Sequence, residues 1–152
     1  MGIYDTVMVG VDGSDSSYRA VHRATELAKD ARARLVIVCA YQSEPHGVAQ
    51  HARDVLGEEA YQVRGPNPAE ETLRVAAERA YGQGMPEQAI ETTRLRGDPV
   101  PSLVTASRRA DADVLVVGDR GLNTLTGRIL GSVPGDVTRR APCDVVIAHT
   151  TS

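Results

Sequence analysis

The segment Val114–Ser132 reads VLVVGDRGLNTLTGRILGS, an apolar run that ends in a glycine and leads into a glycine-rich stretch. The run VLVVG is β-branched and lacks polar alternation, which is typical of a strand buried on both faces. Two further runs share this character, VMVGV at Val7–Val11 and LVIVCAY at Leu35–Tyr41. Because such strands occur in parallel sheets that helices cover on both sides, the segment predicts an α/β fold.

Outside this segment, strands and helices are predicted to alternate along the chain. The expected strands are Tyr4–Val11, Leu35–Tyr41, Ala89–Leu95, Val114–Gly118 and Asp144–His149. The expected helices are Ser16–Asp30, one from Asn67-Pro68 to Gly82 or Gly84, one that starts at Asp98-Pro99 and has Arg108 and Arg109 in its last turn, and one that Ser132 caps and that ends at Arg139 and Arg140. Strict alternation of this kind predicts a parallel sheet with helical crossovers.

Composition narrows the class of protein. A chain of 152 residues with 41% hydrophobic residues suits one globular domain, 1–152, in which Gln42–Pro66 is a polar excursion. The net charge of -3 and the absence of Phe and Trp argue against a nucleic-acid partner. The start, MGIYDTVMVG, lacks the basic region of a signal peptide, and no apolar run approaches membrane-spanning length. A cytoplasmic protein without a membrane partner is expected.

The sequence lacks the motifs of several common classes of enzyme and of metal sites. The only lysine is Lys29, so the Gly-Lys-Ser/Thr phosphate loop of switch and motor NTPases is absent. No Gly-x-Ser-x-Gly elbow of a hydrolase is present. Cys39 and Cys143 are interpreted as reduced, buried thiols, and the scattered histidines have no ligand spacing, so no metal site and no catalytic residue is predicted.

Two segments that follow predicted strands carry the candidate chemistry. In open α/β sheets the ligand lies beyond the carboxyl ends of the strands, where the connections diverge. Val11–Asp15 follows the first strand, and Gly118–Gly121 follows the fourth. After nine intervening residues, Gly131-Ser132 precedes a predicted helix, where free backbone N–H groups and a hydroxyl suit a phosphate. The same residues also suit plain turns and helix caps.

GDRGLNTLTGRILGSVPGDVTRRAPCDVVIAH resembles the C-terminal signature of the universal stress protein family, and VMVGVDGSDSSYRAVHRATELA resembles its first strand and helix. The resemblance spans nearly the whole chain apart from Gln42–Pro66. Its glycine motif has the form found in members that bind ATP. The resemblance implies an open five-stranded parallel sheet of order 3-2-1-4-5, Rossmann-like and adenine-nucleotide-binding, and a homodimer that pairs through Asp144–His149.

The resemblance also implies a set of nucleotide-binding residues. Asp12 would hydrogen-bond the adenosine part, and Ala40 would line the adenine pocket with backbone groups. Glycines and their neighbours would wrap the ribose and phosphates, with the strand ends and two arginines completing the set: Gly10, Val11, Val117, Gly118, Arg120, Gly121, Arg128, Gly131, Ser132 and Val133.

One residue departs from the family pattern and leaves the ligand open. Asp119 lies inside the glycine motif, where members more often carry a small neutral residue, and its carboxylate should weaken binding of a triphosphate. Arg120 and Arg128 offer guanidinium groups that would offset it. The expected ligand is ATP, with or without Mg²⁺, or cyclic AMP, whose phosphate carries less charge.

Three functional hypotheses follow. The first is a nucleotide-binding module that acts as a sensor or reservoir in the stress response. The second is a slow ATPase, with Asp12 the only residue suited to position water or Mg²⁺. The third is a ligand-independent dimer that docks to partners, although the intact glycine motif argues against it.

Overall fold

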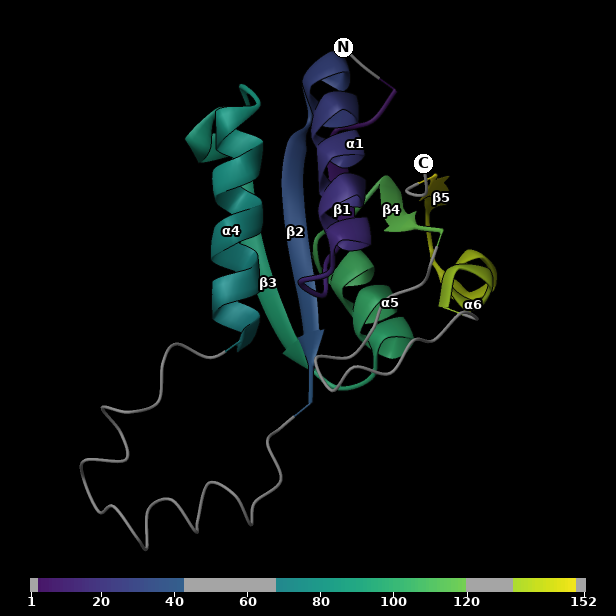
Figure 1. Cartoon of the computed structure of the whole chain (residues 1–152). Coiled ribbons are helices and arrows are strands. Elements are labelled where there is room, and N and C mark those ends of the chain that lie inside the picture. The colour runs from purple at the N-terminus through teal and green to yellow at the C-terminus, as the bar shows by residue number, and fades with distance from the viewer. Residues whose placement is uncertain (1–2, 43–67, 120–132, 150–152) are drawn as a thin grey trace, which may run out of the picture.

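The computed structural model describes residues 3–42, 68–119 and 133–149 of the chain. Figure 1 shows five strands side by side in one sheet, with helices packed against it. The strands are β1 (Thr6–Gly10), β2 (Arg34–Tyr41), β3 (Ile90–Arg96), β4 (Val114–Gly118) and β5 (Asp144–Ala148). The helices are α1 (Asp15–Ala31), α4 (Pro68–Gly82), α5 (Pro99–Arg109) and α6 (Val133–Arg140), with a short 3-10 helix η1 (Glu87–Ala89).

The strand order is β3-β2-β1-β4-β5, and every neighbouring pair is parallel. This confirms the predicted fold class. All residues of β1 and β4 and residues Leu35–Ala40 of β2 are buried, because helices cover both faces of the sheet centre. The edge strands β3 and β5 are partly exposed, in keeping with the polar side chains of β3.

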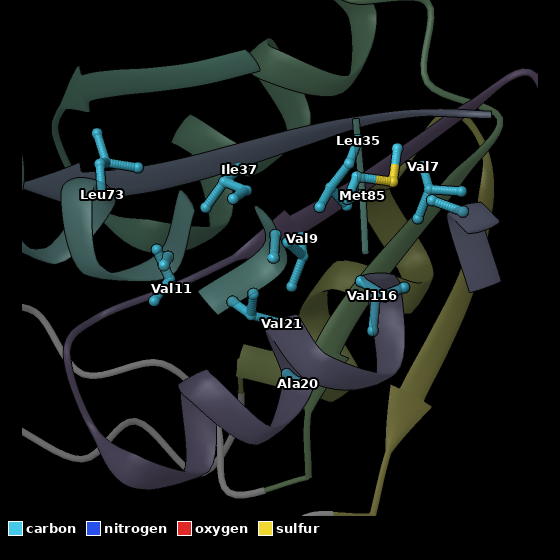
Figure 2. Close-up of a cluster of buried hydrophobic side chains, with 14 of the residues drawn as sticks. Val7, Val9, Val11, Ala20, Val21, Leu35, Ile37, Leu73, Met85 and Val116 are labelled. Atoms are coloured by element: carbon cyan, nitrogen blue, oxygen red, sulfur yellow. The ribbon is translucent and has the colours of Figure 1, made fainter. Parts of the chain in front are cut away.

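Successive strand residues enter two different cores, as the period of two in a strand requires. Val7, Val9 and Ile37 pack with α1 and α4 on one face. Met8, Val36 and Leu115 pack with α5 and α6 on the other. Figure 2 shows the first core, where side chains of α1 and α4 meet side chains from the strands of the sheet. The core is aliphatic throughout, as the composition predicts.

Several strand boundaries differ from the predicted ones by one or two residues, and hydrogen bonds explain two of these differences. β1 starts at Thr6 and not at Tyr4, because the backbone N–H groups of Asp5 and Thr6 both donate to Oδ2 of Asp113, at 2.8 and 2.9 Å. β5 ends before His149, since the carbonyl of Ala148 accepts the last sheet-like bond, from Asp119 N–H at 2.9 Å. Ala89 belongs to η1 and not to β3.

The helices begin and end close to the predicted residues, with one difference in capping. α5 follows Asp98, but the carboxylate of Asp98 makes no capping bond to its own helix and accepts from Nε2 of Gln42 at 2.8 Å. Its first residue is Pro99, which needs no N–H partner there. Among the residues that the structure describes, no helix is long and apolar enough to cross a membrane.

Candidate functional site

The strand order brings two distant parts of the sequence to one edge of the sheet. β1 pairs in parallel with β4, so their carboxyl ends lie side by side. From β1 the chain crosses to β2 on one side, and from β4 it crosses to β5 on the other. A crevice forms outside the carboxyl ends of an open α/β sheet where the connections diverge in this way. Gly10 and Gly118, the last residues of these two strands, therefore lie at this same edge of the sheet.

Asp12 lies at this edge and is only 6% exposed. Its Oδ1 atom accepts two hydrogen bonds from Ser14, one from the backbone N–H at 2.9 Å and one from the hydroxyl at 2.6 Å. Its own N–H donates to Oγ of Ser17 at 3.2 Å. Gly13 has a φ of 89°, a left-handed conformation that glycine adopts without strain. The turn Asp12–Ser14 thus holds a buried carboxylate in one orientation.

Ser14 and Ser17 link this turn to the start of α1. Ser14 is the N-cap of α1, and its side chain accepts from the N–H of Ser17 at 3.1 Å. The hydroxyl of Ser17 donates back to the carbonyl of Ser14 at 2.9 Å. Sequence reasoning placed Ser14 near Asp12 but missed Ser17. The spacing Asp-x-Ser-x-x-Ser before an apolar helix was the signal that could have found it.

The remaining predicted residues at the strand ends have small or buried side chains, so mainly their backbone groups are available to a ligand. Gly10 and Gly118 are the last residues of β1 and β4, and Ala40 lies near the end of β2 at 7% exposure. Val11 and Val117 are buried in opposite cores. Any contact of these residues with a ligand would therefore come from N–H and C=O groups.

Part of the predicted site lies outside the described residues, namely Arg120, Gly121, Arg128, Gly131 and Ser132. Val133 is the first residue of α6, so this helix begins directly after the predicted cap. The structure therefore brings together the predicted residues of β1, β2 and β4.

Asp119, which directly follows β4, contacts the end of β5. Its Oδ2 lies 3.2 Å from Nδ1 of His149, and its side chain is 25% exposed, against 80% for His149. Its backbone N–H donates to Ala148. Sequence reasoning noted the Asp119 charge but not this partner, because the two residues come from different strand ends.

The two cysteines are free. Cys39 belongs to the core on the α1 and α4 face of the sheet, and Cys143 packs against the core on the other face. Burial, together with the smaller effect of the Asp12 carboxylate that would repel a thiolate, raises the pKa of the Cys39 thiol to about 12. Cys143 is only partly buried, so the prediction of two buried thiols was wrong for this residue. Within 3–42, 68–119 and 133–149, no three His, Cys, Asp or Glu side chains gather as a metal site would require.

A shallow groove of about 380 Å³ lies between α1 and α4, away from these residues. It is lined by exposed or partly exposed side chains: Tyr18, Arg19, His22, Arg79, Gly82 and Gln83. None of them belongs to the predicted nucleotide site, so the groove is a separate feature.

Comparison with known proteins agrees with this geometry. The family model described as universal stress protein family matches residues 3–149. Universal stress protein Rv1636 of Mycobacterium tuberculosis is 48% identical over 151 residues, which cover 99% of this chain and 100% of that protein.

Solved structures of universal stress proteins also match this chain. A universal stress protein in complex with cyclic AMP is 41% identical, has a TM-score of 0.72, and the match covers 97% of this chain and 98% of that one. A family member from Arabidopsis thaliana with AMP bound matches 97% of this chain and 92% of its own, with a TM-score of 0.66. At 20% identity, this second likeness concerns the fold alone.

Proposed function

The chain belongs to the universal stress protein family, and from that premise we propose that it binds an adenine nucleotide outside the carboxyl ends of β1 and β4. The observation that carries this proposal is the buried carboxylate of Asp12, held by Ser14 at the point where the connections of the sheet diverge. A solved relative of 41% identity that holds cyclic AMP supports the class of ligand.

Each part of the nucleotide has a proposed partner. Asp12 would accept hydrogen bonds from the adenosine part, while its bonds to Ser14 keep it oriented. The backbone of Ala40 and Val11 would face the adenine, because both side chains are small or buried. Gly10, Val117 and Gly118 would permit close approach of the ribose through their backbone.

The phosphates would lie against the segment between β4 and α6. There Arg120, Gly121, Arg128, Gly131 and Ser132 are the proposed contacts, with the N-terminus of α6 at Val133. Free N–H groups at a helix start favour phosphate, and arginine forks fit its oxygens. ATP, with or without Mg²⁺, and cyclic AMP remain the two proposed ligands.

We further propose that residues 1–152 form one domain and that the protein works as a homodimer in the cytoplasm, in the stress response. β5 is the proposed pairing edge, since Ile147 on this edge strand is 45% exposed. The free cysteines suit a reducing compartment.

Glycine substitutions test the site. In Gly121→Val or Gly131→Val, the new side chain should occupy the space of the ribose or phosphate and abolish binding of ATP and cyclic AMP in calorimetry. Gly82→Val is the matched control, because a Cβ at Gly82 meets no atom within 4 Å. Circular dichroism should show the same fold in all variants. Full binding by both site variants would refute the proposed location.

A further inference from the structure

We propose that Asp119, held beside His149, makes the nucleotide site discriminate by phosphate charge. The site would favour adenine nucleotides whose phosphate carries one charge, such as a cyclic monophosphate, over a triphosphate. This inference rests on the proposed nucleotide-binding function and adds a residue that determines specificity within it.

The position of Asp119 puts a negative charge at the edge of the crevice. Asp119 follows Gly118, the last residue of β4, so their Cα atoms are about 3.8 Å apart. Its side chain is only 25% exposed, so water screens its charge less than that of a fully exposed carboxylate. A phosphate bound near the end of β4 would therefore experience its repulsion.

The structure also shows where this carboxylate is directed. The N–H of Asp119 donates to the carbonyl of Ala148 at 2.9 Å, and its Oδ2 lies 3.2 Å from Nδ1 of His149. Both contacts are made with the end of β5, whereas Asp12 and β1 lie on the other side of β4. The contact with His149 thus holds the carboxylate on the β5 side, away from the β1 side of the crevice.

His149 therefore acts as a positioning residue for Asp119. It limits the repulsion without removing it, because its side chain is 80% exposed and any charge on it is well screened. Two unit charges about 8 Å apart alter an equilibrium roughly 2- to 30-fold across the dielectric range between water and a protein surface. Since each phosphate charge adds to the repulsion, a triphosphate is penalised more than a cyclic monophosphate, and adenosine is not penalised.

The test is calorimetric titration of the full, nucleotide-stripped chain with adenosine, cyclic AMP and ATP, at fixed ionic strength and with Mg²⁺ chelated. Asp119→Asn should raise the affinity for ATP on the order of tenfold, raise that for cyclic AMP less, and leave that for adenosine unchanged. As a single substitution, His149→Ala should lower the affinity for ATP a few-fold. In a chain that already carries Asp119→Asn, it should leave that affinity unchanged. Asp30→Asn makes the same charge change near the exposed C-terminal end of α1 and should alter nothing.

The outcomes separate this inference from the function on which it rests. If the unaltered chain binds cyclic AMP and Asp119→Asn changes all three affinities equally, or lowers that for ATP, charge discrimination by Asp119 is refuted while nucleotide binding stands. An effect of His149→Ala that persists in the Asp119→Asn background would refute the positioning role. If none of the three compounds binds the unaltered chain, the proposed function fails and the inference with it.

Discussion

At the scale of single residues, the turn at Asp12 combines two roles that sequence alone could not separate. Asp12 does not cap α1 in the structure; Ser14 does, while its hydroxyl also donates to Asp12. Helix capping and orientation of the carboxylate therefore share one side chain. A substitution at Ser14 should affect both the stability of the fold and the proposed binding of nucleotide.

Ser14→Ala should lower the free energy of unfolding by about 1 kcal/mol, because the N–H of Ser17 loses its capping acceptor. It should also weaken nucleotide binding, since Asp12 loses the bond from the hydroxyl. Urea denaturation and calorimetry measure the two effects. Ser14→Thr keeps the hydroxyl and should restore both. Unchanged stability in Ser14→Ala would contradict the capping role.

The Cys39 thiol should be unreactive in the folded protein. Burial raises its pKa to about 12, so at pH 8 almost no thiolate exists to react. Because the unfolded chain ionises this thiol near its ordinary pKa, the stability it contributes is intact below about pH 9 and is lost as the pH rises toward 12.

An aromatic disulfide reagent at pH 8 checks this expectation. It should modify Cys39 only after urea unfolds the chain, whereas Cys143, which is partly buried, should react sooner. Burial also raises the pKa of Cys143, so its reaction should still be slower than that of a free thiol. Rapid modification of Cys39 in the native protein would show that β2 opens readily.

At the scale of elements, the continuous apolar runs predicted the three central strands well. β1, β4 and residues Leu35–Ala40 of β2 are buried, so their sequences have no polar face to obscure the pattern. The ends of the elements were less predictable, because hydrogen bonds between residues far apart in the sequence decide where the elements stop. Asp113 accepts from the backbone before β1, and Asp98 bonds Gln42 in place of its own helix. Such partners are distant in sequence and leave no local pattern.

The difference between central and edge strands predicts a difference in stability. Leu115 in β4 is fully buried, so Leu115→Ala should lower the free energy of unfolding by about 2–5 kcal/mol. Ile147 in the neighbouring β5 is 45% exposed, and Ile147→Ala should cost far less in the monomer. Denaturant titration at low protein concentration compares the two. Equal losses would mean that β5 is covered as fully as β4.

If β5 is the pairing edge of a homodimer, a charge at Ile147 should separate the protomers. Ile147→Lys would place an ammonium group on the exposed edge strand, where cations discourage pairing. Sedimentation velocity should show a dimer for the unaltered chain and a monomer for the variant, with unchanged circular dichroism. A dimer in both cases would exclude this part of β5 as the interface.

At the scale of the whole molecule, the position of the candidate site depends on the strand order. Periodicity in the sequence predicts strands and helices but not which strands are neighbours; the order came from the family resemblance and is confirmed. That order sets Asp12 and Gly118 at adjacent strand ends although more than a hundred residues separate them. It also creates the contact between Asp119 and His149, which no sequence pattern indicated.

Calorimetric titration of the purified, nucleotide-stripped chain with ATP and Mg²⁺ and, separately, with cyclic AMP would show directly whether the chain binds an adenine nucleotide. We expect saturable binding of an adenine nucleotide at one site per chain, with cyclic AMP bound more tightly than ATP if Asp119 repels phosphate charge. Absence of binding heat with both compounds would contradict nucleotide binding. It would favour a dimer that docks to partners without a ligand.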